Sequence, residues 1–157
     1  MTLIIDAFNI IADSPVVFVD QSGIHSSLTG RRMDNTPEHL ITPDRVVQIY
    51  GQGVASLATA STCHLEATWT ITDTVYLSGA LEGLGKFGIQ TALIQYASAY
   101  NRMLKDAQGK IAQLRNSNGS VRFLSAVATV GEFEYPDTSE EYYNAVEYTI
   151  TLTEYVQ

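Results

Sequence analysis

The chain has 157 residues, a length that suits a single domain over 1–157. Hydrophobic residues make up 45% of it and charged residues 17%, so it can bury a core and is not disordered as a whole. The net charge of −8 argues against a general affinity for nucleic acid or anionic membranes, because both attract cationic patches. No apolar run reaches the length of about 18 residues that a membrane-spanning helix needs. The single cysteine, Cys63, excludes an internal disulfide.

Charge is unevenly distributed along the chain. Residues 123–157 contain seven acidic residues and no Lys or Arg, whereas residues 84–122 contain six basic residues and one acid, Asp106. Opposed charged regions of this kind can pair within one chain, or head to tail between copies, which builds rings or filaments. Two solvated faces of a monomer are the alternative interpretation.

The N-terminal part predicts a helix, a strand and a long loop. Residues 2–12 space their apolar side chains as a helix does, although the β-branched isoleucines leave a strand possible. Val16 to Asp20 has the composition of a strand. From Gln21 to Pro43 the periodicity is lost, which predicts a protruding loop at 21–43 that orders against a neighbour, with a hairpin inside it as the alternative.

The middle of the chain predicts two strands. Arg45 to Tyr50 is the shorter one, and the Gly51-Gln52-Gly53 step follows it. Cys63 to Thr72 alternates in character from residue to residue, so one side should meet a core and the other water or a partner. The side expected to face the core consists of Cys63, Leu65, Ala67, Trp69 and Ile71.

A long amphipathic helix is predicted from Lys86 to Arg115, ending before the turn sequence Asn116-Ser117-Asn118-Gly119. Its apolar stripe comprises Ile89, Leu93, Tyr96, Ala97, Tyr100, Met103, Leu104, Ala107, Ile111 and Leu114.

Two strands, Val121 to Tyr135 and Ala145 to Val156, should finish the chain as antiparallel neighbours. In the second strand the residues expected to point inward are Val146, Tyr148, Ile150, Leu152 and Val156, and those expected to point outward are Glu147, Thr149, Thr151, Thr153 and Tyr155. The predicted fold is therefore α+β: an antiparallel sheet with a short N-terminal helix and one long helix packed across a sheet face.

No cluster of residues points to a particular chemistry. His64 and Glu66 share one side of a strand, but a zinc site would need two more ligands. Cys63 falls on the apolar side of that strand, which favours a buried residue over a nucleophile. Gly85-Lys86 lacks the following Ser or Thr of a phosphate-binding loop, and Asp137, with its acidic neighbours, does not follow the calcium-loop pattern. We therefore expect a protein that is not an enzyme, with no cofactor and no metal.

Tyrosines gather near the C-terminus, where five lie among carboxylates and threonines: Tyr135, Tyr142, Tyr143, Tyr148 and Tyr155. A tyrosine offers a large contact area with a polar tip, which is typical of protein interfaces. A carbohydrate-binding surface, or a sheet rich in aromatic residues through propensity alone, are the competing interpretations.

The order of these elements, together with the Thr-rich alternation from Val146 to Leu152, resembles the small tail-terminator and head-tail joining proteins of tailed bacteriophages. That resemblance implies a ring, commonly a hexamer, at the tail or neck of a virion. The implied partners are copies of the chain and other virion proteins such as the tail tube or connector. It further implies location in the virion after synthesis in the host cytoplasm, with no membrane partner and no sequence-specific nucleic acid.

The leading hypothesis is therefore a structural protein that assembles into a ring. Candidate subunit-interface residues are Arg31, Arg32, Arg102, Lys105, Glu140, Glu141, Tyr142, Tyr143, Glu147 and Tyr155. The alternative is a small-ligand-binding α+β domain whose pocket lies between helix and sheet, with Tyr96, Tyr100 and Trp69 as its walls. A hydrolase or isomerase built on His64 and Glu66 ranks last.

Overall fold

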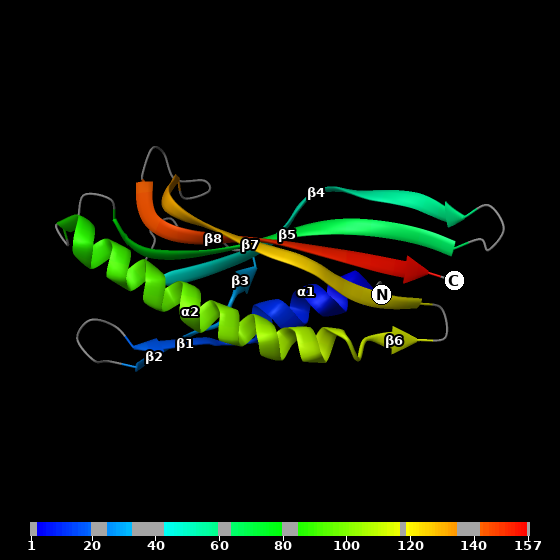
Figure 1. Cartoon of the computed structure of the whole chain (residues 1–157), viewed down its shortest axis with the longest axis horizontal. Helices are drawn as coiled ribbons and strands as arrows, with labels where there is room; N and C mark the ends of the chain where they lie inside the picture. The colour runs from blue at the N-terminus through cyan, green and yellow to red at the C-terminus, as the bar shows by residue number, and fades with distance from the viewer. Residues whose placement is uncertain are drawn as a thin grey trace.

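A computed structural model describes residues 3–19, 25–32, 43–59, 64–79, 85–116, 119–134 and 142–156. Within these ranges the chain forms two helices, a two-stranded sheet and a six-stranded sheet (Figure 1). The predicted α+β class is confirmed, with one short N-terminal helix and one long helix.

The short helix α1 spans Leu3–Asp13 and packs on the core through Ile4, Ala7 and Ile11. These residues lie three and four positions apart, so they share one side of the helix. The backbone N–H of Leu3 donates to Glu154 Oε1 at 2.9 Å, so a carboxylate satisfies one free amide at the positive end of the helix. The helix ends where Ser14 donates to the carbonyl of Ile10 through both its backbone N–H and its hydroxyl.

The long helix α2 spans Gly85–Ile111 and stops short of the predicted end at Arg115. After Ile111 the amide of Leu114 donates to the carbonyl three residues before it, which tightens the last turn. The chain then enters β6, Arg115–Asn116. Arg115, which was predicted to be the last residue of the helix, is therefore part of a strand. The buried side of α2 comprises Leu93, Tyr96, Ala99, Tyr100, Met103, Leu104, Ala107 and Ile111.

The six-stranded sheet has the strand order β3-β4-β5-β8-β7-β6. Only β3 runs parallel to its neighbour, and the other adjacent pairs are antiparallel. The remaining strands of this sheet are β3 Arg31–Arg32, β4 Asp44–Thr59, β5 His64–Gly79, β7 Gly119–Glu134 and β8 Tyr142–Val156.

The predicted loop at 21–43 is partly strand. β2, His25–Leu28, pairs antiparallel with β1, Val16–Val19, and β3 pairs with β4. The alternative of a hairpin in this region is therefore confirmed for 25–28. Its short polar strand has no apolar alternation of its own, which is why periodicity did not reveal it.

The predicted strand at Arg45 to Tyr50 is also longer than expected, because β4 continues to Thr59 across the Gly51-Gln52-Gly53 step. A register shift between Tyr50 and Val54 accommodates that step. The glycines therefore mark a bulge within a strand and do not end it.

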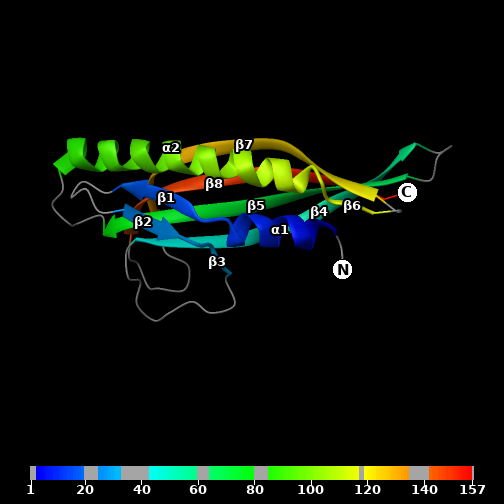
Figure 2. The same cartoon turned by 90° about the horizontal axis from the view of Figure 1, so that it is seen from below.

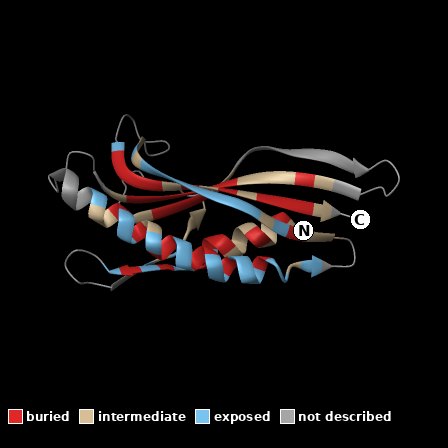
Figure 3. Cartoon of the chain, in the orientation of Figure 1, coloured by how far each residue is buried: buried red, intermediate tan, exposed pale blue. Residues whose placement is uncertain are grey.

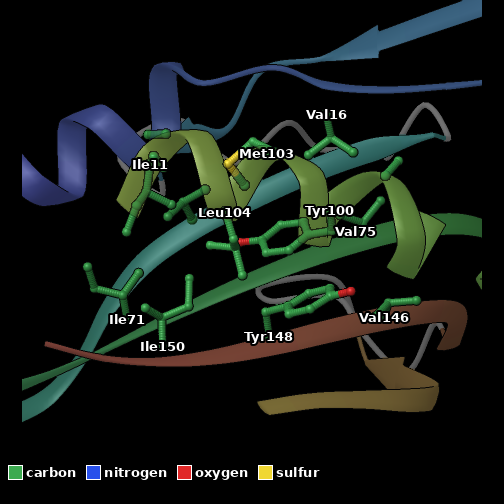
Figure 4. Close-up of a cluster of buried hydrophobic side chains, with 14 of the residues drawn as sticks. Ile11, Val16, Ile71, Val75, Tyr100, Met103, Leu104, Val146, Tyr148 and Ile150 are labelled. Carbon is green, nitrogen blue, oxygen red and sulfur yellow. The ribbon is translucent and has the colours of Figure 1, made fainter. Parts of the chain in front are cut away.

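The main core lies on one face of the six-stranded sheet, where α1, α2 and the β1–β2 pair all pack (Figure 2). The inward prediction for β8 is confirmed for Val146, Tyr148, Ile150 and Leu152, which are at most 2% exposed. Figure 4 shows the first three of them within the core. Thr153 lies on the side opposite Leu152, as predicted, but it is fully buried there and approaches Thr68 at 3.3 Å between hydroxyl oxygens.

A second, smaller apolar cluster lies on the opposite face of the sheet, because its residues alternate with those of the main core along the strands. It consists of Val46, Tyr76, Tyr143 and Ala145, with Phe133 against them. The rings of Tyr76 and Tyr143 meet edge to face with centroids 6.0 Å apart.

Candidate assembly interface

The strand β7 presents an open edge. Beyond its short pairing with β6 at Gly119 and Ser120, the outer side of β7 has no strand partner among the described residues. The Val121 N–H donates to the Leu114 carbonyl at 3.4 Å, and the backbone groups of β7 beyond it on that side are available to another strand.

The centre of this edge strand is exposed and uncharged. All seven residues from Leu124 to Val130 are exposed, as the pale ribbon of β7 shows (Figure 3). The exposed fractions are 49% for Leu124, 60% for Val127 and 51% for Val130. Proteins usually protect such an edge with charged residues or proline, or with a bulge. Here the one irregularity is a register shift at Leu124, between Phe123 and Ser125.

The opposite edge of the six-stranded sheet, at β4, is also mostly unpaired among the described residues. β3 pairs with β4 only at Val46 and Val47, so the outer side of β4 from Gln48 to Thr59 has no strand partner in the described part of the chain. In the part of the chain that the structure describes, one continuous sheet thus has an unpaired stretch at each edge, on β4 and on β7. Two copies can join such edges without rearranging either fold.

The predicted basic interface residues fall into two groups. Arg31 forms an ion pair with Asp44, and Arg32 donates to Asn9 Oδ1 at 2.9 Å and 3.1 Å and to Asp13 Oδ1 at 2.9 Å. These two arginines hold the chain's own elements together. The other two, Arg102 and Lys105, are exposed on α2 and remain candidates for contacts between subunits.

The predicted tyrosines also divide. Tyr142, the first residue of β8, is 53% exposed, whereas Tyr143 beside it is only 9% exposed and belongs to the second apolar cluster. Tyr155 is partly buried, and the guanidinium carbon of Arg122 lies 5.7 Å from its ring centroid. Tyr142 is therefore the predicted interface tyrosine that is most open to a partner.

The predicted acidic residues are described only in part. Glu147 is half-buried and accepts a hydrogen bond from the Thr74 hydroxyl at 3.4 Å. Glu140 and Glu141 lie outside the described residues.

The centre of the core holds a fully buried ion pair that the sequence analysis did not predict. Arg45 on β4 and Asp73 on β5 are diagonal neighbours in the antiparallel register, and both side chains are 0% exposed. The shortest contact, from Arg45 Nη2 to Asp73 Oδ2, is 2.6 Å. Arg45 Nε donates to the other carboxylate oxygen, Oδ1, at 3.0 Å, so two nitrogens engage the two oxygens in the bidentate geometry that strengthens such contacts.

The same arginine ties this pair to the N-terminal elements. Its remaining N–H groups donate to the carbonyls of Ile11 at 2.8 Å, Ser14 at 2.6 Å and Leu28 at 3.3 Å. Burial alone lowers the pKa of Arg45, but the charge and hydrogen bonds of Asp73, together with Tyr100, outweigh burial, and the pKa is raised. Arg45 therefore stays charged and links α1 and β2 to the sheet.

Two tyrosines complete this cluster. The Tyr100 hydroxyl donates to Asp73, and the Tyr100 ring stacks on that of Tyr148 with centroids 3.6 Å apart. Burial, helped by the Asp73 charge, raises the pKa of Tyr100 well above its usual value and the pKa of Tyr148 to about 12. Both phenols are neutral at physiological pH. The charged groups of this buried cluster are therefore Arg45 and Asp73.

These contacts bear on the predicted ligand pocket. Tyr100 is 0% exposed and Tyr96 is 4% exposed, with the Tyr96 ring packed on that of Phe18 at a centroid distance of 3.9 Å. Their side chains fill the space between helix and sheet, whereas Trp69, the third residue of the predicted pocket, is partly buried against the same core.

The predicted catalytic and metal-binding residues gain no support from the described part of the chain. Glu66 is half-buried on β5, and Cys63 lies outside the described residues. Among the described residues no group of three or more His, Cys, Asp or Glu side chains is placed to hold a metal ion. Neither described helix is long and apolar enough to cross a membrane.

Comparison with known proteins returns no relative: no family model matches the chain, and no curated protein matches it.

Proposed function

We propose that this chain is a structural protein, not an enzyme, that assembles with copies of itself through the edges of its six-stranded sheet. The observation that carries the proposal is the open edge of β7, where residues 124–130 are exposed and uncharged. An exposed apolar edge strand is a liability for a protein that stays alone, and a binding surface for one that assembles.

The two open edges favour a head-to-tail arrangement. The β7 edge of one copy can pair with the β4 edge of the next, and this contact repeats because each copy still offers one free edge. A heterologous contact of this kind closes into a ring if its rotation closes, and otherwise extends as a filament. The opposed charges of residues 84–122 and 123–157 would add specificity to the same contact.

The biological setting of the proposal comes from the resemblance to tail-terminator and head-tail joining proteins. In that setting the assembly is a ring, commonly a hexamer, at the tail or neck of a tailed phage. Its partners would be other virion proteins, such as the tail tube or the connector.

The test is the absolute mass in solution by light scattering, at low and high salt, for the unchanged chain and two variants. Val127→Lys places a charge on the edge at a side chain that is 60% exposed, so the fold should tolerate it. Asn101→Lys adds the same charge on the exposed side of α2 and is the matched control. Circular dichroism and thermal melting should show that both variants stay folded.

We expect a discrete species of several subunits for the unchanged chain and for Asn101→Lys, and at least a tenfold weaker association for Val127→Lys. Lysine on an edge is a common means of blocking strand pairing. A monomer of 17.2 kDa at every concentration would contradict self-assembly. Equal masses for all three proteins would show that β7 is not the contact.

A further inference from the structure

A groove lies between β1 and α2, the two elements that pack side by side on the core face of the six-stranded sheet. It has a volume of about 340 Å³ and is lined by Phe18, Val19, Ile94, Gln95, Ser98 and Arg102. Two of its apolar residues are open to solvent, with Ile94 69% exposed and Val19 41% exposed. The neighbouring Val17 is 52% exposed, so the groove lies within an exposed apolar patch.

One end of the groove is cationic. Arg102 is exposed and forms no ion pair or hydrogen bond with any residue that the structure describes, in contrast to Arg31, Arg32 and Arg45. Lys105 is exposed on the next turn of α2. The groove therefore suits an apolar or aromatic side chain that is accompanied by carboxylates, because the guanidinium can pair with the acid while the ring covers Ile94.

The start of β8 has this complementary chemistry. Tyr142 is the large exposed aromatic residue of the described chain, at 53%. Glu132 on β7 is exposed, and the register places it diagonally opposite Tyr142 on the same side of the sheet. Residues 123–157 carry no Lys or Arg to compete for the Glu132 carboxylate. Because the ladder with β7 holds Tyr142 in an exposed position, it does not occupy the groove of its own chain.

We infer that the groove between β1 and α2 receives the Tyr142 end of β8 from a neighbouring copy of this chain. The aromatic ring covers Ile94 and Val19, and the Glu132 carboxylate near Tyr142 meets Arg102. This inference rests on the proposed self-assembly and adds to it a second contact between copies, distinct from the β7 edge.

The test is site-specific photo-crosslinking in the full-length chain, with the mass of each sample measured by light scattering beforehand. The variant Ile94→p-benzoylphenylalanine carries the probe in the groove. The matched control, Gln108→p-benzoylphenylalanine, carries the same probe on the same helix but at a separate cavity lined by residues of β6 and β7. Crosslinked peptides are identified by mass spectrometry of a mixture of isotope-labelled and unlabelled protein, which separates contacts between copies from those within one chain.

We expect the Ile94 probe to crosslink to the peptide that contains Tyr142 in another copy, and the Gln108 probe to give none of that product. Adding Arg102→Glu or Tyr142→Ala should reduce the product at least fivefold, whereas Tyr155→Ala should leave it unchanged. An oligomeric sample whose Ile94 probe reacts elsewhere, or with no other copy, overturns this contact alone. A monomeric sample with no product between copies overturns both this contact and the proposed assembly.

Discussion

The substitution Asp73→Asn tests the buried ion pair directly, because it removes one negative charge and almost no volume. Asp73 accepts hydrogen bonds from Arg45 Nε and Nη2 and from the Tyr100 hydroxyl, and its side chain is 0% exposed. Asparagine can still accept from Tyr100, but it leaves the equally buried guanidinium of Arg45 without a countercharge. The change therefore isolates the electrostatic part of the interaction.

The expected loss of stability is large. Removing one partner of a buried ion pair costs about 3–5 kcal/mol, since the remaining charge cannot recover its hydration. The whole free energy of unfolding of a domain is about 5–15 kcal/mol. For a chain of this size the loss corresponds to a decrease in Tm of roughly 6–20 °C.

Urea unfolding at pH 7, followed by circular dichroism, measures this effect. Asp13→Asn is the matched control, because Asp13 also pairs with an arginine but its side chain is 69% exposed. We expect that variant to lose less than about 1 kcal/mol, as exposed ion pairs do. The double variant Arg45→Met with Asp73→Asn should lose at least about 1 kcal/mol less than the sum of the two single losses, because the two groups interact directly.

Two results would refute this reasoning. One is a loss for Asp73→Asn no larger than that for Asp13→Asn. The other is strict additivity in the double-mutant cycle, which would mean that Arg45 and Asp73 contribute independently.

Three further variants test other parts of the fold. The pKa of Tyr148 is raised to about 12, so the folded chain holds this proton more tightly than the unfolded chain and the free energy of unfolding should fall as the pH rises from 10 towards 12. Tyr148→Phe should flatten that fall in urea titrations from pH 9 to 12, and an unaltered slope would contradict the assignment. Gly30→Ala should cost about 1–3 kcal/mol, because its Cβ would lie 2.5 Å from Val47 Cγ2 and 3.0 Å from the Ala12 backbone. Gly109→Ala, with no atom within 4 Å of its Cβ, should instead gain about 0.5–1 kcal/mol, and similar melting temperatures for these two variants would contradict the argument.

The sequence alone predicted the elements whose residues alternate or repeat over a long stretch. The α2 stripe and the inward residues of β8 follow from spacing, because each long element has one side that must be buried. The helix end at Ile111 and the strand at 25–28 were missed, since a tightened last turn and a short polar strand leave little pattern in a sequence.

The candidate interface was predictable only in part. The charge asymmetry pointed to Arg102 and Lys105, which are exposed, and the tyrosine count pointed to Tyr142. The open edge at Val127 was not predicted, because a strand's place in the order of a sheet depends on which distant segments pair with it. Nothing in residues 124–130 distinguishes an edge strand from a central one of the same composition.

What the sequence by itself determined is the α+β class, the long helix and the inward side of β8, because burial of apolar surface imposes its period on each segment separately. Only the tertiary structure decided that Arg45 would be buried in an ion pair with Asp73 and that Tyr96 and Tyr100 would fill the core. Those outcomes depend on which side chains of β4, β5 and α2 come into contact. The periodicity of a single segment does not predict contacts between distant segments.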